Sequence, residues 1–137
     1  MAWQRKDGRI ARRRAEILID LRFRDTAPVR DLPMLHWLGV WCRQPVQRER
    51  FVPAAEQATV LRIERKLKTL ARKASNGWAV YVMRIVSEGL VQYFFYARGA
   101  GALDGVSAEL RKSFPRYRFE HDSEPDAEWV EYLDRSK

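Results

Sequence analysis

The stretch from Trp78 to Arg98, WAVYVMRIVSEGLVQYFFYAR, has apolar side chains at odd and even positions alike. A β-strand with one face in water alternates apolar and polar residues, so a hairpin built from this stretch has apolar side chains on both faces. Both faces must be covered, either by other parts of the chain or by a partner. This requirement favours folds in which a central sheet lies between other layers.

The position of Gly89 predicts how the two strands of this hairpin pair. A three-residue loop with Gly89 in the left-handed conformation places Arg84 opposite Gln92, so that two polar residues share a face. A two-residue turn instead requires a positive φ at Glu88, which glutamate disfavours. We therefore expect the three-residue loop.

In this register the two faces differ in composition. One face is wholly apolar, and we expect helices to cover it: Ala79, Tyr81, Met83, Ile85, Val91, Tyr93, Phe95 and Ala97. The other combines aromatic residues with arginines, which is typical of a contact surface, and its candidate partner-binding residues are Trp78, Arg84, Phe94, Tyr96 and Arg98. Trp37 and Trp41 extend it. The alternative is that a terminal segment or a second subunit covers this face.

The remaining segments predict further strands and helices. The Asp7-Gly8 pair predicts a turn within a basic N-terminal hairpin segment, residues 1–14, which we expect to be able to move. Period-two alternation predicts a strand over residues 15–24, and an apolar run predicts an interior strand over 34–42.

Helical periodicity begins near residue 53. An amphipathic helix of about twenty residues starts near Pro53 and ends before Asn76-Gly77. A second helix is expected over residues 102–113 and a strand over 116–121. Ser123 and Asp126 resemble a capping box for a last helix that buries Trp129, Tyr132 and Leu133. The order predicts an α+β fold, a single-domain (residues 1–137) ferredoxin-like sandwich with helices on one face of a mainly antiparallel sheet.

Charge is unevenly distributed along the chain. Residues 1–74 hold 18 Lys and Arg against 8 Asp and Glu, whereas residues 75–137 hold 8 against 10. A basic half indicates phosphate or an acidic protein as partner, unless arginine is merely abundant and keeps the surface soluble. The first helix carries the candidate nucleic-acid-binding residues on its polar side: Arg62, Arg65, Lys66, Arg72 and Lys73, with Lys68 beside them and Arg12, Arg13 and Arg14 as further candidates.

The residue types indicate no catalytic constellation, cofactor or metal site. His36, His121 and Cys42 are far apart in sequence, so a metal site on neighbouring strands is a minor alternative to three separate strand residues. No glycine-rich phosphate loop or serine nucleophile motif is present. No apolar segment is long enough to span a membrane, and the basic start lacks a signal-peptide core. The single cysteine indicates a reducing cytoplasm.

Motifs spread from Trp3 to Leu133 carry a family resemblance. They include the ending Asp126-Ala127-Glu128-Trp129-Val130-Glu131-Tyr132 and the pair Phe95-Tyr96 after Gly89. With these residues the chain resembles the bacterial domain of unknown function 695. That family is distantly similar to the regulator of ribonuclease E activity, type B, a ferredoxin-like protein that acts by binding an enzyme. At Gly89 the chain departs from the family pattern Gly-x-Arg-Glu, so no role of that Arg-Glu pair is carried over.

Two functions follow as expectations. The first is a non-catalytic cytoplasmic protein-interaction module, an adaptor, inhibitor or immunity-type regulator, that uses the mixed face, with self-association as a special case. The alternative is nucleic-acid binding, to RNA in particular, through the basic helix and the N-terminal arginines. The two differ in salt dependence, because phosphate contacts weaken steeply as salt rises.

Overall fold

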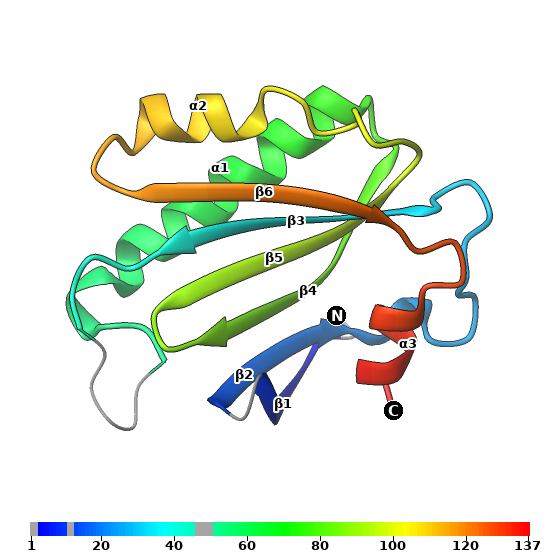
Figure 1. Cartoon of the computed structure of the whole chain (residues 1–137), viewed down its shortest axis with the longest axis horizontal. Coiled ribbons are helices and arrows are strands. Elements are labelled where there is room, and N and C mark those ends of the chain that lie inside the picture. The colour runs from blue at the N-terminus through cyan, green and yellow to red at the C-terminus, as the bar shows by residue number, and fades with distance from the viewer. Residues whose placement is uncertain (1–2, 11–12, 46–50) are drawn as a thin grey trace.

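The computed structural model of the chain describes residues 3–10, 13–45 and 51–137. Its elements are, in order, β1 (Trp3–Ile10), β2 (Arg13–Asp20), β3 (Met34–Trp41), α1 (Gln57–Ser75), β4 (Ala79–Ser87), β5 (Leu90–Ala97), α2 (Val106–Ser113), β6 (Arg118–Pro125) and α3 (Val130–Arg135). Short 3-10 turns, Leu21–Phe23 and Ala54–Glu56, follow β2 and precede α1. The strands form one antiparallel sheet in the order β1-β2-β4-β5-β3-β6 (Figure 1).

The segment from β3 to β6 confirms the predicted α+β, ferredoxin-like fold. It runs strand–helix–strand twice, and its four strands lie in the order β4-β5-β3-β6. Each helix connects two strands that are separated by an inserted antiparallel neighbour, which is the split βαβ arrangement. The hairpin of β1 and β2 extends this sheet, because β2 pairs with the free edge of β4. No helix among the described residues is long and apolar enough to cross a membrane.

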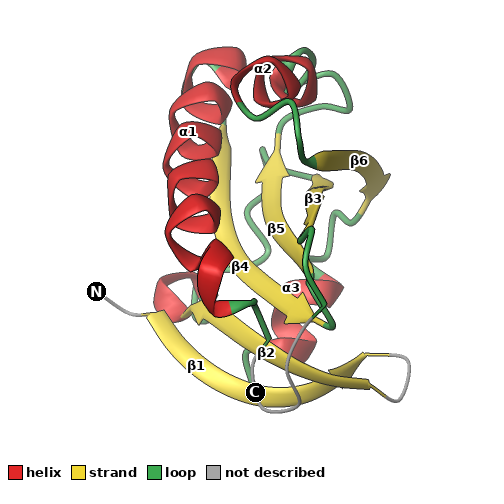
Figure 2. Cartoon of the chain, turned by 90° about the vertical axis from the view of Figure 1, so that its left-hand side faces the viewer, coloured by secondary structure: helices red, strands yellow, loops and turns green. Residues whose placement is uncertain are grey.

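Each face of the sheet has its own core (Figure 2). On one face α1 and α2 cover strands β3, β4 and β5, and α1 buries Val60, Ile63, Leu67 and Ala71 there, as its periodicity predicted. The opposite face is covered by α3 and the segments before it, with Trp129 and Tyr132 fully buried. The two apolar faces of the Trp78–Arg98 hairpin are thus both covered within the chain.

The predicted turn between β4 and β5 was wrong. Glu88 and Gly89 form a two-residue turn with φ of 48° and 83°, the type I′ geometry whose twist matches the flanking strands. Arg84 therefore lies opposite Tyr93 and not Gln92. At the far end of the hairpin the predicted register holds, and an irregularity between Tyr81 and Met83 absorbs the one-residue difference.

The predicted N-terminal hairpin has its turn in a different place. β1 continues through Asp7 and Gly8, and the ladder extends to the pair Ile10–Arg13, so that residues 11 and 12, which lie outside the described residues, connect the strands. The following strand ends at Asp20, earlier than predicted, because the Asp20 carboxylate accepts the backbone N–H of Arg22 and begins a 3-10 turn.

The last helix begins later than predicted. Ser123 does not cap it, since β6 extends to Pro125 and pairs with β3 along its whole length. The N-cap residue of α3 is Trp129, and the carboxylate of Asp126, three residues earlier, accepts the backbone N–H groups of Val130 and Glu131 at 2.8 and 3.2 Å. The second helix also starts later, at Val106.

Candidate functional site

The aromatic centre of the predicted contact surface is buried. Tyr96 is inaccessible to solvent and Phe94 is 8% exposed. The indole of Trp129 lies on the ring of Tyr96 and the Tyr96 hydroxyl donates to Asp126 at 2.6 Å. The expectation that Phe94 and Tyr96 contact a partner was wrong, because a segment of the same chain already covers them.

Arg84 was also placed on the wrong face. The one-residue shift near the turn directs its side chain under α1, where Nη1 lies 3.2 Å from Oε1 of Glu64. The hydroxyl of Tyr81 donates to the same carboxylate at 2.7 Å. Burial, and then the adjacent Glu64, raise the pKa of Tyr81 well above its usual value. This network anchors α1 to the sheet and is closed to a large partner.

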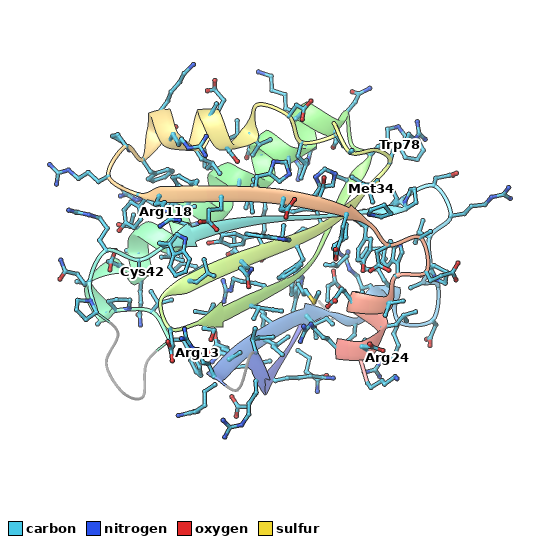
Figure 3. The ribbon with its side chains drawn as sticks, in the orientation of Figure 1. Arg13, Arg24, Met34, Cys42, Trp78 and Arg118 are labelled. Atoms are coloured by element: carbon cyan, nitrogen blue, oxygen red, sulfur yellow. The ribbon has the colours of Figure 1, made fainter. Side chains whose placement is uncertain are left out.

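Of the five candidate partner-binding residues, Trp78 and Arg98 stay at the surface. Trp41, which was expected to extend the same face, is 37% exposed as well. Trp78 is 44% exposed, and the guanidinium carbon of Arg98 lies 3.5 Å from the centroid of its ring. Trp78 follows the end of α1 after only two residues, and Figure 3 shows it at the edge of the molecule. An arginine stacked on an exposed tryptophan presents both charge and apolar area to a partner.

The solvent side of α1 carries a set of like charges. We call it the cationic face, and it consists of Arg62, Arg65, Lys66, Lys68, Arg72 and Lys73, all exposed. All five predicted nucleic-acid-binding residues belong to it. Among the described residues, none of these six side chains has an ion pair with an acidic residue. Glu64, the single acidic residue of α1, points inward to Arg84.

The N-terminal arginines do not join the cationic face as a group. Arg13 pairs with Glu88 at 3.0 Å, and the guanidinium of Arg14 lies 5.5 Å from the centroid of the Phe51 ring. Arg12 lies outside the described residues. Within the described part of the chain, the charges assigned to the cationic face therefore come from α1.

An exposed apolar residue at the edge of the cationic face was missed. Leu61 is 46% exposed and precedes Arg62 in the sequence. On a helix Leu61 is adjacent to Arg65, four residues on, so an apolar side chain lies at the edge of the cationic face. The sequence does indicate this exposure, because the helical repeat of 3.6 residues places Leu61 on the polar side of α1.

The pairing of two histidines was missed as well. His36 on β3 is fully buried, and its Nδ1 lies 2.9 Å from Nε2 of His121 on β6, while its Nε2 contacts the carbonyl of Gly99 at 2.8 Å. The antiparallel register brings the two rings together, since His121 lies opposite Leu38 on the same face. Burial and the neighbouring His36 lower the pKa of His121, against the raising effect of Asp104 and Asp122.

Cys42 does not join the histidines. No group of three or more metal-ligand side chains occurs in the part of the chain that the structure describes. Burial, and then Glu56, raise the pKa of the Cys42 thiol to about 11, so it is a poor nucleophile at neutral pH. Its carboxylate neighbour Glu56 accepts the backbone N–H groups of Arg43 and Gln44, and thereby ties the segment after β3 to the start of α1.

Comparison with known proteins identifies a family. A model described as a family of unknown function (DUF695) matches residues 1–135. No curated protein and no solved structure matches the chain. The match confirms the family resemblance expected from the sequence motifs, whereas the distant similarity to the regulator of ribonuclease E activity, type B, remains an expectation.

Proposed function

The chain belongs to the DUF695 family, a family of unknown function, and we propose that it is a non-catalytic module that binds an acidic protein through the cationic face and Trp78. The proposal keeps the protein-interaction function expected from the sequence and moves it to a different surface. A cytoplasmic location is part of the proposal, because a lone cysteine suits a reducing compartment.

The observation that carries the proposal is the unbalanced charge of α1. Six exposed cations span Arg62 to Lys73, about 16 Å along the helix axis, and α1 turns its one carboxylate, Glu64, inward. A surface of one charge sign attracts a partner of the opposite sign and increases its association rate. The partner surface is accordingly rich in aspartate and glutamate.

Apolar side chains at this surface favour a protein as the partner. Leu61 and Trp78 are exposed by 46% and 44% and lie near opposite ends of α1. Tryptophan and arginine are the residues that most often dominate protein–protein binding energy, especially where the partner excludes water from them. Trp78 with Arg98 over its ring provides both residue types at one position.

Nucleic-acid binding is the second candidate function, because all five predicted phosphate-binding residues are exposed on one helix face. One feature of the fold favours the protein partner over it. RNA-binding proteins with a four-stranded sheet of this kind stack bases on aromatic residues of the open sheet face, whereas here Trp129 covers Tyr96 on that face.

The test is a pull-down with tagged protein from lysate of the native host, with and without nuclease and at low and moderate salt. We expect an identified acidic protein that survives nuclease treatment and is lost with the Arg65→Glu/Arg72→Glu variant and with Trp78→Ala. The matched control is Arg30→Glu/Arg116→Glu, which changes the net charge equally at exposed sites that are not part of α1. This control should retain the protein.

Two outcomes contradict the protein partner. Recovery that disappears with nuclease and falls steeply with salt assigns the cationic face to nucleic acid. Equal recovery by the α1 variant and by its matched control shows that the cationic face is only a solvated surface.

A further inference from the structure

A cavity lies between the start of α1 and strands β2, β4 and β5, and Figure 2 shows the hairpin of β1 and β2 below this end of the helix. Its volume is about 420 Å³, which is enough for one large side chain. Apolar side chains form most of its wall: Phe51, Val52, Val60, Leu61, Val86 and Val91. An apolar group that enters this space leaves water, and the gain is proportional to the apolar area that it buries.

Leu61 joins this cavity to the surface of α1. Its side chain lines the cavity, and the residue is still 46% exposed. Gln57, one helical turn earlier, also lines the cavity and is exposed as well. The cavity is therefore open to solvent along α1, and a partner that lies on this helix can reach it from outside.

The row of helix residues that begins at the cavity continues into the cationic face. Positions three and four residues apart are neighbours on a helix surface. This row, which we call the α1 row, consists of Gln57, Leu61, Arg65, Lys68 and Arg72. Lys68 shows where the α1 row lies, because its Nζ is 5.6 Å from the centroid of the Tyr81 ring on β4. The α1 row thus follows the border between the helix and the sheet, with the cavity at one end and cations along the rest.

The charge around the cavity is positive on balance. Two arginines of its wall have carboxylate partners, since Arg5 pairs with Glu16 at 3.7 Å and Arg84 pairs with Glu64 at 3.2 Å. The guanidinium of Arg14 lies 5.5 Å from the centroid of the aromatic ring in the wall. Arg14 has no ion pair with an acidic residue in the part of the chain that the structure describes. This excess of positive charge favours an acidic segment over a basic one.

We propose that the acidic partner carries an apolar anchor residue that enters this cavity, while its neighbouring aspartate and glutamate residues bind along the α1 row. The inference rests on the proposed function and adds the chemistry of the segment that the partner presents. The anchor lies against Val60, Val86 and Val91, and the acidic residues contact Arg65 and Lys68. An anchor in a pocket that excludes water supplies much of the binding energy, and the charges orient the segment and increase its association rate.

The geometry of the α1 row sets the length of a test peptide. Lys68 follows Leu61 by seven residues, which is about 10 Å along the helix axis. Four extended residues span about 13 Å, so a segment anchored in the cavity reaches Lys68 with four acidic residues. The probe is therefore a peptide with one central phenylalanine and four glutamates on each side, with both ends blocked. A second peptide has alanine at the centre, and a third has lysine in place of every glutamate.

Fluorescence anisotropy of the labelled peptides with the full chain, at moderate salt, measures their binding. We expect the phenylalanine peptide to bind at least about tenfold more tightly than the alanine peptide, because its ring leaves water in the cavity. The lysine peptide should not bind, since the cations of α1 repel it. The Arg65→Glu/Arg72→Glu variant should weaken the binding of both glutamate peptides, because both depend on the cationic face.

Two matched variants test whether the anchor binds in the cavity. Gln57→Trp places a large ring at the exposed end of the cavity wall. It should reduce the affinity for the phenylalanine peptide to that for the alanine peptide, and leave the alanine peptide unaffected. Ala58→Trp adds the same ring at the next position, which is exposed and not part of the cavity wall, and should leave both affinities unchanged. Circular dichroism of each variant confirms that a loss of binding comes from a folded protein.

The results separate this inference from the proposed function. Equal affinity of the two glutamate peptides overturns the inference alone and leaves the cationic face as a surface for acidic partners. Equal effects of Gln57→Trp and Ala58→Trp on the phenylalanine peptide also overturn it, because the ring then binds elsewhere. If neither glutamate peptide binds, or if both bind the wild type and the Arg65→Glu/Arg72→Glu variant equally well, the proposed function fails and the inference fails with it.

Discussion

The ring of Trp129 lies parallel to the ring of Tyr96, with centroids 4.1 Å apart and an angle of 10° between the planes. The contact joins the start of α3 to the middle of the sheet. Trp129 has a φ of 55°, which is unfavourable for a bulky residue, and the hydrogen bond from its Nε1 to the carbonyl of Leu32 holds it in place. A residue in a strained conformation persists only where its surroundings stabilise it.

We predict that Trp129→Ala lowers the free energy of unfolding by about 3–5 kcal/mol, because it empties a fully buried site. Urea denaturation monitored by circular dichroism measures the change. The matched control is Trp78→Ala, which removes an exposed indole and should cost less than about 1 kcal/mol. Similar losses in the two variants contradict the assignment of Trp129 to the core.

The turn at Glu88 predicts a stabilising substitution. Glu88 has a φ of 48°, and asparagine tolerates this left-handed conformation better than glutamate does. Glu88→Asn should therefore raise the free energy of unfolding by about 0.5–1 kcal/mol. The lost ion pair with Arg13 is exposed and worth little. Thermal unfolding measures the effect, with Glu124→Asn as the control substitution. A midpoint for Glu88→Asn below that of the wild type contradicts the prediction.

The lowered pKa of His121 predicts a loss of stability in mild acid. Because the pKa of His121 in the folded protein lies below its usual value of 6.5, the unfolded chain binds the proton more readily. The contribution of neutral His121 to stability is fully present above about pH 6.5 and is lost as the pH falls through the folded pKa. His121→Gln keeps an N–H donor for His36 and removes this titration, so its stability should change less between pH 7 and pH 5. Midpoints of urea denaturation measured between pH 7 and pH 5 test this prediction. Parallel curves of midpoint against pH for the variant and the wild type would contradict it.

Glu56 predicts a second, more acidic transition. Burial alone raises the pKa of Glu56, but hydrogen bonds from the backbone of Arg43 and Gln44 and from Tyr117 outweigh it, so the pKa lies below the usual value of 4.5. A carboxylate with a lowered pKa stabilises the fold above about pH 4.5, and this contribution is lost as the pH falls through the folded pKa. Glu56→Gln should be less stable at neutral pH and show a shallower decline below pH 4.5. Unfolding at pH 7 and pH 3.5 tests this, with Glu128→Gln as the exposed control.

Local patterns predicted the elements well where one face of an element is buried. The alternation of Ile17 and Ile19 identified β2, and the spacing of Val60, Ile63 and Leu67 identified the buried side of α1. These patterns report burial directly, because side chains repeat every two residues in a strand and every 3.6 in a helix. The order of the elements then led to the ferredoxin-like fold.

Register and long-range contacts were beyond local patterns. The face of Arg84 depended on whether Glu88 accepts a positive φ, and a one-residue difference moved the side chain to the other face. The cover over Tyr96 comes from Trp129, 33 residues later, and no periodicity links the two. The second apolar face of the hairpin did indicate that some cover was required, and the aromatic residues of the last helix were available to provide it.

The position of α3 has a consequence for biosynthesis. A ribosome makes this chain from its N-terminus, so β2 and β5 are complete before Trp129 and Tyr132 exist. The hydroxyl of Tyr132 donates to the carbonyl of Asp20 at 2.6 Å, which joins residues made late to a strand made early. During translation the aromatic face with Tyr96 is open to chaperones or to unwanted association, and it closes only when the residues of α3 have left the ribosomal exit tunnel.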